Sequence, residues 1–397
     1  MLTKEEIEWI KSHSKEDTAK LRLKYRGDIR TAYLIDQIDC RRKAAAKLRH
    51  TLQNEAFEFP TELSQEQSTS DRLARFHTSL VAKGSTVADL TAGLGIDALH
   101  MARKCLNVTA VEIDSHIAAT LRDNALVLGI NNLEVLCGDC TSLLPQMGEY
   151  DSMFIDPARR GEHSRRLYAL SECHPDVVAM IPEIKKHTGQ LIAKISPMLD
   201  ISDVCSRLSP YITGIIALGA RRECKELIAI CDLSREHGKE PEIKAVTLCP
   251  DDTEHEFSFT RTEEAAATAD FGDPHPGLYL IDPYPSVMKT APWRLLCSGS
   301  GMTTASNNTH IYFSPSVRDD IGESYLIEEV LPYSSGEIKR LARRWPQASV
   351  ATRNFPLRAD DLRRKLKVRD SNDVRLYGIT DSNRKPLMVI CRTIARQ

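Results

Sequence analysis

The chain has 397 residues, of which 42% are hydrophobic and 27% are charged, and its formal net charge at pH 7 is −2. This length predicts two or three domains that each bury a core. No apolar run approaches the roughly 18 residues that a membrane span needs, so we expect no membrane partner. Because the net charge is close to zero, any surface for a polyanion must be local.

Eleven cysteines are scattered along the chain, mostly in apolar segments such as Ile230-Cys231 and Ile390-Cys391. This distribution predicts reduced, buried thiols rather than a disulfide framework. The first six residues have no apolar core of the signal-peptide kind. We therefore expect a cytoplasmic protein.

The N-terminal region predicts helices. Residues 4 to about 53 carry apolar side chains at helical spacing. A basic run within it fits either a solvated helix face or a phosphate-contacting surface, and comprises Arg41, Arg42, Lys43, Lys47 and Arg49. Pro60 and the polar residues 62–70 predict a linker, after which Asp71 caps a short helix through Leu80. Residues 1–72 are assigned to this helical region.

A glycine loop follows the first predicted strand. Residues 87–90 predict a short buried strand and residues 98–103 a helix, with Gly93 and Gly95 between them. Glycine allows a sharp turn and the close approach of a ligand, so a strand, a glycine turn and a helix form a nucleotide-type cradle. The pattern also fits a dinucleotide site, because Glu112 lies about 20 residues further on. A loop without a ligand remains the alternative.

Strands then alternate with helices, which is typical of a doubly wound α/β sheet. The gap between the last two strands is too short for a crossover helix, so these strands should form an antiparallel hairpin. We assign residues 73–236 to one Rossmann-like domain with a seven-stranded sheet. Its strands are predicted at residues 87–90, 108–112, 133–136, 152–155, 190–195, 213–218 and 227–231.

The charged segment 234–241 predicts a domain boundary. Residues 237–334 are assigned to a linker and a ferredoxin-like domain, and residues 335–397 to a small α+β domain. Irregular sequence is expected up to Gly277. Beyond the boundary, strands are predicted at residues 242–248, 256–260, 278–281, 311–313, 325–331, 349–355, 374–379 and 387–391, and helices at residues 336–344 and 359–366.

Acidic residues follow three neighbouring strands. Asp89 can accept hydrogen bonds from the loop or pair with a ligand ammonium. The carboxylate of Glu112 can bind both hydroxyls of a ribose, and Asp139 can accept from an adenine amino group. Each acid alone also fits a helix cap or a surface charge. Cys137 and Cys140 form a C-x-x-C pair, but no second pair lies nearby, so we expect no metal.

The fourth strand runs into Asp156-Pro157-Ala158-Arg159. Over residues 68–235, this order of acids, glycines and Asp-Pro with a closing hairpin resembles the class I S-adenosylmethionine-dependent methyltransferases. The resemblance implies S-adenosyl-L-methionine as cofactor, with the glycine loop under its methionine part, Glu112 at the ribose and Asp139 at the adenine. Residues 68–70 would close over the methionine end. The implied cofactor-binding residues are Asp89, Thr91, Ala92, Gly93, Gly95, Glu112, Ile113, Asp139, Cys140 and Asp156.

Asp156-Pro157 resembles the D/N/S-P-P-aromatic motif of enzymes that methylate base amino groups. Ala158 and Arg159 depart from it, and Asp-Pro-x-Arg is closer to RNA uridine-C5 methyltransferases. Those enzymes need a cysteine after the fifth strand, where this chain has Lys194-Ile195-Ser196-Pro197. We therefore expect direct methyl transfer. The resemblance implies Asp156, Pro157 and Arg159 as catalytic residues, and Arg159, Arg160 and Lys194 as substrate-binding residues.

A second Asp-Pro, at Asp282-Pro283 before Tyr284, lies past the hairpin and is interpreted as a turn. Around it, residues 308–312, 329–333 and 353–357 resemble the THUMP-like module and its ferredoxin-like neighbour in one group of bacterial methyltransferases. Residues 37–42 and 66–70 extend that resemblance over nearly the whole chain. True THUMP domains bind RNA, mostly tRNA.

The C-terminal region has a local excess of cations, which suits a phosphate backbone, although a solubilising helix face is the alternative. The cations are Lys339, Arg340, Arg343, Arg344, Arg353, Arg358, Arg363, Arg364, Lys365, Lys367 and Arg369. We therefore predict a methyltransferase that acts on a base of structured RNA, either tRNA or rRNA. An RNA-binding protein with an inactive methyltransferase fold and a methyltransferase with a non-RNA substrate remain alternatives. An NAD-linked oxidoreductase is disfavoured, because it does not explain Gly138-Asp139, Asp156-Pro157 and the closing hairpin.

Overall fold

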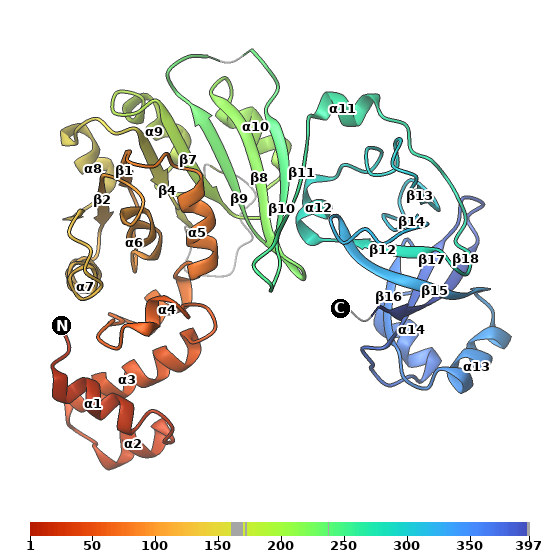
Figure 1. Cartoon of the computed structure of the whole chain (residues 1–397), viewed down its shortest axis with the longest axis horizontal. Helices are drawn as coiled ribbons and strands as arrows, with labels where there is room; N and C mark the ends of the chain where they lie inside the picture. The colour runs from red at the N-terminus through yellow and green to blue at the C-terminus, as the bar shows by residue number, and fades with distance from the viewer. Residues whose placement is uncertain (160–169, 171–172, 237, 395–397) are drawn as a thin grey trace. The chain divides into compact units, whose positions relative to one another are not determined.

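The computed structural model describes residues 1–159, 170, 173–236 and 238–394, and the chain forms two compact units (Figure 1). Unit 1 comprises Met1–Ile212 and Ala229–Gly238, and unit 2 comprises Thr213–Ile228 and Lys239–Gln397. In the part of the chain that is described, no helix has the length and apolar character needed to cross a membrane.

Unit 1 begins with helices, as predicted. They are α1 (Lys4–Ser12), α2 (Thr18–Lys24), α3 (Ile29–Ala44), the 3₁₀ turn η1 (Thr51–Gln53), α4 (Glu62–Gln67) and α5 (Asp71–Ser79). The side chains of Thr3, Asp17 and Asp28 accept hydrogen bonds from the first turns of α1, α2 and α3, which satisfies donors that a helix start leaves free. Leu21 and Ile35 lie in the core that these helices share.

Two details of this region differ from the sequence-based expectation. The predicted linker at residues 62–70 contains α4, which a capping box between Thr61 and Ser64 begins. The cap of α5 is Ser70, whose hydroxyl accepts from Leu73 N–H, and not Asp71. Asp71 is buried instead, and its carboxylate contacts Thr51 and the Nε2 of His100.

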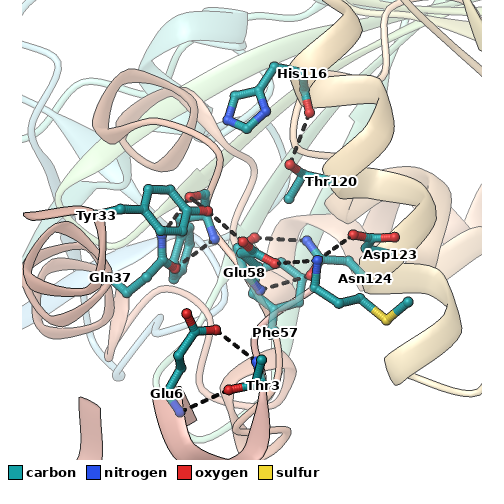
Figure 2. Close-up of polar contacts among 12 residues, drawn as sticks. Thr3, Glu6, Tyr33, Gln37, Phe57, Glu58, His116, Thr120, Asp123 and Asn124 are labelled. Atoms are coloured by element: carbon teal, nitrogen blue, oxygen red, sulfur yellow. Dashed lines mark hydrogen bonds and ion pairs between the residues drawn. The ribbon is translucent and has the colours of Figure 1, made fainter. Parts of the chain in front are cut away.

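The N-terminal helices are fastened to the rest of unit 1 by buried amides (Figure 2). Asn124, on α7 (Ser115–Val127), accepts from Glu58 N–H at 2.8 Å and donates to the Glu58 carbonyl at 2.9 Å. Gln37 pairs in the same way with the backbone of Phe59, at 2.9 and 2.7 Å. Tyr33 donates to the Glu58 carboxylate at 2.6 Å. A buried amide that loses its partners is costly. The Asn124 pair therefore holds Glu58 to α7, and the Gln37 pair holds Phe59 to α3.

The central sheet of unit 1 contains the five parallel strands that the sequence predicts. They are β1 (Thr86–Asp89), β2 (Asn107–Glu112), β3 (Leu133–Cys137), β4 (Ser152–Ile155) and β7 (Gln190–Ile195). The strand order is β7-β4-β1-β2-β3, and every neighbouring pair is parallel. The carboxyl ends of these strands therefore lie along one edge of the sheet.

Helices connect these strands, and they are α6 (Ile96–Ala102), α7, α8 (Cys140–Leu143), the 3₁₀ turn η2 (Leu144–Gln146), α9 (Val177–Ile184) and α10 (Ile201–Leu208). A short antiparallel pair, β5 (Ala158–Arg159) and β6 (Cys173–His174), follows β4. The strands are almost wholly apolar, with Val87, Ala110 and Phe154 at most 1% exposed, as expected for a parallel sheet covered on both faces.

The hairpin is confirmed as β8 (Ile212–Ala220) and β9 (Glu223–Asp232), which are neighbours in the sheet. Within the described residues the sheet has nine strands, because β10 (Glu242–Leu248) pairs parallel with β8 and β11 (Glu254–Phe259) pairs antiparallel with β10. The full order is β11-β10-β8-β9-β7-β4-β1-β2-β3. The two added strands follow the charged segment 234–241 that predicted a boundary.

Unit 2 holds a second, seven-stranded sheet with the order β13-β14-β12-β15-β18-β17-β16. Its strands are β12 (Tyr279–Pro283), β13 (Thr303–Thr304), β14 (Tyr312–Ser314), β15 (Gly322–Pro332), β16 (Ser349–Arg353), β17 (Val374–Thr380) and β18 (Pro386–Thr393). Its helices are α11 (Arg261–Ala266), α12 (Pro285–Thr290), α13 (Ser335–Arg344) and α14 (Ala359–Leu366).

Two expectations for unit 2 are wrong. The segment before Gly277 contains α11 rather than only irregular sequence. Asp282 and Pro283 lie in β12 rather than in a turn. Proline is tolerated there because β14 pairs with β12 only as far as Ile281, so Pro283 has a strand partner on one side alone. The Asp282 carboxylate accepts from Tyr377 at 2.9 Å and from Arg353 at 3.1 Å, so it anchors two later strands of the sheet.

Candidate active site

The glycine loop joins β1 to α6, and its two glycines have different reasons to be glycine. Gly93 has φ +56° and Gly95 has φ +82°, in the left-handed region. A Cβ added at Gly95 would lie 2.2 Å from a methyl carbon of Leu121, whereas one at Gly93 would meet nothing within 4 Å. Gly95 is therefore required by packing, and Gly93 leaves an open stretch of backbone.

Glu112 ties the end of β2 to this loop. Its carboxylate accepts from Gly93 N–H and from Asp114 N–H, both at 2.8 Å, and the residue is 8% exposed. Each carboxylate oxygen has two lone pairs, so both can still accept from a ligand hydroxyl. The next residue, Ile113, is 64% exposed and leaves an apolar side chain beside the carboxylate.

Asp139 follows β3 and caps α8. It accepts from the N–H and the hydroxyl of Thr141, both at 2.7 Å, and the hydroxyl bond holds the pKa of Asp139 below its usual value. Burial raises the pKa of the neighbouring Cys140 thiol to about 11, so this thiol is unreactive at neutral pH. In the part of the chain that is described, no cluster of side chains is suited to hold a metal ion.

Asp89 ends β1 and is 1% exposed. Burial, together with the negative charge of Asp97, raises its pKa to about 8, against a hydrogen bond from Thr91 N–H at 3.1 Å. The carboxyl group is therefore mostly protonated at pH 7, and a cation placed against it would favour the ionised form.

A chain of polar contacts begins at Asp156, which follows β4. Lys194, on β7, lies 2.6 Å from the Asp156 carboxylate and donates to the Thr69 hydroxyl at 3.1 Å. The backbone N–H of Asp156 donates to the Thr91 hydroxyl at 2.7 Å. Lys194 and Thr91 therefore fix Asp156 from two sides.

The same chain continues into the interior of unit 1. Thr69 donates to Asp97 at 2.6 Å, and the Nδ1 of His77 lies 2.7 Å from the other oxygen of Asp97. Burial disfavours ionisation of Asp97, but the charge and hydrogen bond of His77 outweigh it and hold the pKa of Asp97 below its usual value. Asp97 is therefore ionised, whereas Asp89 is mostly neutral.

The sequence-predicted site residues lie where the parallel strands end. Ala92 holds the loop through its N–H to the Val111 carbonyl at 2.8 Å, and Pro157 is buried directly after Asp156. The backbone of Arg159 pairs with that of Cys173 in the β5–β6 ladder. The prediction for Arg160 falls outside the described residues. Lys194, predicted as a substrate ligand, has Asp156 and Thr69 as partners.

Sequence reasoning missed Asp97 and His77. A sequence signal was present for Asp97, because it lies two residues after Gly95, in the first turn of α6. His77 lies on α5, a separate helix before the sheet, and nothing in the pattern of that helix distinguishes it from a core residue.

Several cations of the C-terminal region are already paired with carboxylates, so only some of them are left to contact a phosphate. Asp282 and Glu329, which lie in earlier strands, pair with three of them, namely Arg353, Arg340 and Arg344. Arg363 and Arg364 pair within α14 with Asp360 and Asp361. The other cations of the C-terminal region form no ion pair among the residues described, and they are Lys339, Arg343, Arg358, Lys365, Lys367 and Arg369.

Comparison with known proteins agrees with this architecture. A crystal structure of a putative methyltransferase from Porphyromonas gingivalis W83 superposes on the chain with a TM-score of 0.88 at 27% identity, over the full length of both chains. Residues 322–393 match the THUMP domain-like family. The protein has a methyltransferase fold and a THUMP-like domain. The predicted fold class and the predicted resemblance are therefore confirmed.

Curated relatives match shorter stretches. The chain is 34% identical over 86 residues to the 23S rRNA (uracil(1939)-C(5))-methyltransferase RlmD of Shewanella amazonensis, covering 21% of this chain and 19% of that protein. It is 28% identical over 137 residues to the protein-L-isoaspartate O-methyltransferase of a Bradyrhizobium species, covering 34% of this chain and 62% of that protein. The chain thus spans about a fifth of the first relative and less than two thirds of the second.

Proposed function

We propose that the protein is an S-adenosylmethionine-dependent methyltransferase that methylates a base in structured RNA. One observation carries the proposal: Asp89, Glu112, Asp139 and Asp156 follow four adjacent parallel strands, around a glycine loop whose backbone is open at Gly93. Ligands of open parallel sheets bind at this edge.

The side chains present suit the methyl donor. Glu112 keeps acceptor capacity for two ribose hydroxyls, Asp139 can accept from an adenine amino group, and the exposed side chain of Ile113 offers an apolar contact to the adenine face. Asp89 can ionise to balance a bound cation. Once bound, the donor supplies a methyl group on a positively charged sulfur.

The chain's own part in transfer is to hold the acceptor and its proton. Asp156 would accept a hydrogen bond from the acceptor, and Lys194 would keep Asp156 ionised and oriented. The rate would come from proximity and orientation. The residues after β7 are Ser196 and Pro197 rather than a nucleophilic cysteine, which favours direct transfer over a covalent intermediate.

RNA is the favoured substrate on two grounds. One relative is named for 23S rRNA, and the chain carries a THUMP-like domain with cations that have no ion pair among the described residues, such as Lys339 and Arg343. The second relative is named for a protein substrate, so protein methylation is the second candidate. The proposed setting is the cytoplasm.

The test is transfer of a labelled methyl group from the donor to total tRNA or rRNA taken from cells that lack the gene. We expect Asp156→Ala to lower transfer at least 100-fold, in the range of a positioned acid or base, while calorimetry gives a donor Kd within threefold of wild type. Glu112→Gln should weaken donor binding. Asp151→Ala, at the opposite end of β4, is the matched control and should do neither.

Two results would contradict the assignment. Full transfer by Asp156→Ala would remove Asp156 from the mechanism. Labelled protein with no labelled RNA would favour the second candidate.

A further inference from the structure

Unit 2 contains a pocket of about 590 Å³ that the proposed methyl transfer does not use. Its lining residues come from α11, β13, β14 and the segment that follows α12. These elements are drawn in teal in Figure 1. Its size is within the roughly 300–1,000 Å³ that ligand sites occupy. Its walls include Arg261, Ala291, Trp293, Arg294, Asn307 and His310.

An aromatic pair forms one part of the wall. The rings of Trp293 and His310 are stacked, with centroids 3.9 Å apart and an interplanar angle of 30°, and both side chains are partly exposed. Tyr312 donates to the Trp293 carbonyl at 3.2 Å and so fixes the backbone that carries the indole. Burial, with the charge of Arg353 adding to it, lowers the pKa of His310, so its ring is neutral at pH 7. The pair therefore offers an uncharged π surface.

The backbone of the pocket is held in costly conformations. His310 has φ +49° and Ala291 has φ +60°, in the region that non-glycine residues rarely adopt. The neighbour of His310, Thr309, is fully buried and donates to the Thr380 carbonyl at 3.1 Å, which pins this turn. Such strain persists where the surroundings enforce it, and it gathers at binding sites.

Two cations and an amide complete the wall. Arg261 donates to the Thr290 carbonyl at 2.9 Å, and Arg294 lies 3.3 Å from the Ala265 carbonyl. Within the described residues, neither guanidinium forms an ion pair. The one carboxylate of the pocket, on Glu264, is engaged by the backbone N–H groups of Arg294 and Leu295, at 2.9 and 3.1 Å. The exposed side chain of Asn307 adds a donor and an acceptor.

We propose that this pocket binds one unpaired nucleotide of an RNA, with its base against the Trp293–His310 pair and its phosphate at Arg261 and Arg294. An aromatic face attracts any base, and a guanidinium binds phosphate oxygens in a fixed fork. A flipped-out or single-stranded residue fits such a wall, whereas a paired base has no exposed face to offer. The proposal rests on the proposed function only for RNA as the source of the nucleotide.

The test is binding of the full-length protein to fluorescein-labelled hexauridylate, followed by anisotropy. We expect Trp293→Leu to weaken binding about tenfold or more, as loss of one stacked base does, and Trp293→Phe to stay within about threefold. His310→Asn should also weaken binding, and asparagine tolerates the positive φ, so the fold is kept. Trp9→Leu is the matched control, because Trp9 stacks on His13 in the same way in unit 1.

Two further ligands show whether the pocket binds a nucleotide within an RNA or a free nucleotide. A blunt RNA duplex of the same length should bind more weakly than hexauridylate. Uridine 5′-monophosphate should bind more weakly still, since it lacks neighbouring phosphates. If the monophosphate binds as tightly as the hexamer, the pocket takes a free nucleotide and the RNA assignment is overturned.

The outcome is independent of the methyltransferase proposal, because calorimetry with S-adenosylmethionine on the same variants reports unit 1 alone. Suppose that nucleotide binding depends on Trp293 but that the protein does not bind S-adenosylmethionine. That result would support the pocket and contradict the proposed function. Hexauridylate affinities of Trp293→Leu and His310→Asn within twofold of wild type would overturn the pocket, even if RNA is methylated. Absence of binding by the wild-type protein at 100 µM would overturn it as well.

Discussion

Among single residues, Asp89 is the one whose burial bears on the proposed binding of the methyl donor. Its pKa of about 8, raised by burial and Asp97, means that the free protein carries a proton there at pH 7. A bound cation favours the carboxylate, so donor binding should release this proton. We therefore expect donor affinity to rise with pH, by up to tenfold per unit, and to level off above about pH 8.

The measurement is calorimetric titration of the donor between pH 6 and 9, in two buffers with different heats of ionisation. The donor's own amino group titrates near pH 8, so Asp89→Asn is the control that keeps this contribution and removes the carboxyl. The difference in the pH dependence of donor affinity between the wild-type protein and Asp89→Asn gives the contribution of the Asp89 carboxyl group. Identical pH profiles for both would contradict the role assigned to it.

Lys194 is the residue that positions Asp156. Replacing it with methionine keeps much of the apolar stem but removes the cation 2.6 Å from the carboxylate. We expect kcat to fall about 10- to 100-fold, as for a misplaced catalytic group. In a plot of kcat against pH, the fall in rate on the acid side should move to higher pH. The reason is that the variant lacks the nearby cation that favours the ionised carboxylate. Lys194→Arg should restore the profile, and a uniform loss of activity at every pH would indicate a merely structural role.

Much of the candidate site was predictable from sequence, because each acid follows a strand and parallel strands end on one edge. The pairing of Asp156 with Lys194 was not predictable, because Asp156 follows β4, Lys194 lies on β7, and their side chains meet only because these two strands are neighbours in the sheet. The protonation of Asp89 was also hidden, because its pKa depends on burial and on the position of Asp97. Sequence patterns indicate which side chains lie near an edge of the sheet. They do not indicate which of these side chains form ion pairs or which are protonated.

At the scale of elements, the glycine loop allows a matched comparison. Gly95→Ala adds a methyl group 2.2 Å from Leu121 at φ +82°, so it combines steric overlap with backbone strain. We expect a loss of about 2–4 kcal/mol in the free energy of unfolding. Gly93→Ala, with φ +56° and no neighbour within 4 Å, should lose only about 1 kcal/mol. Urea unfolding of both variants is the measurement, and equal losses would contradict the packing argument.

Gly93→Ala should have the larger effect on the ligand. Its added methyl group would enter the open space next to the backbone, so donor affinity should fall more than stability does. This separation of stability from affinity follows from the different surroundings of the two glycines.

Elements with a clear period were predicted well, and α14 was predicted at its observed bounds. Short helices defined by caps were not predicted. Helix α4 has only six residues, Glu62–Gln67, follows the N-cap Thr61 and lies in a polar stretch that resembles a linker. The strands β10 and β11 were predicted as strands but were placed after a boundary. β10 pairs with β8, and β11 pairs with β10. Local sequence does not encode this pairing, because β8 lies before the charged segment 234–241 and the two strands lie after it.

At the scale of the whole molecule, the chain carries the proposed chemistry in unit 1 and the proposed RNA contacts in unit 2. Because the proposal gives binding of the RNA to unit 2 and methylation to unit 1, weakened RNA contacts in unit 2 should raise KM for RNA and leave kcat little changed. The cations of unit 2 are not equivalent in this respect, because some already have carboxylate partners.

Lys339 and Arg343 line a hollow on α13 and have no ion pair among the described residues, whereas Arg363 and Arg364 pair with Asp360 and Asp361. Replacing Lys339 and Arg343 with alanine should weaken RNA binding and reduce the slope of log K against log salt by about 0.7–0.9 per cation. Replacing Arg363 and Arg364 should change the slope less, because their charges are already balanced. Filter binding from 50 to 300 mM salt gives both slopes, and equal changes in the two variants would mean that only the total charge of unit 2 matters.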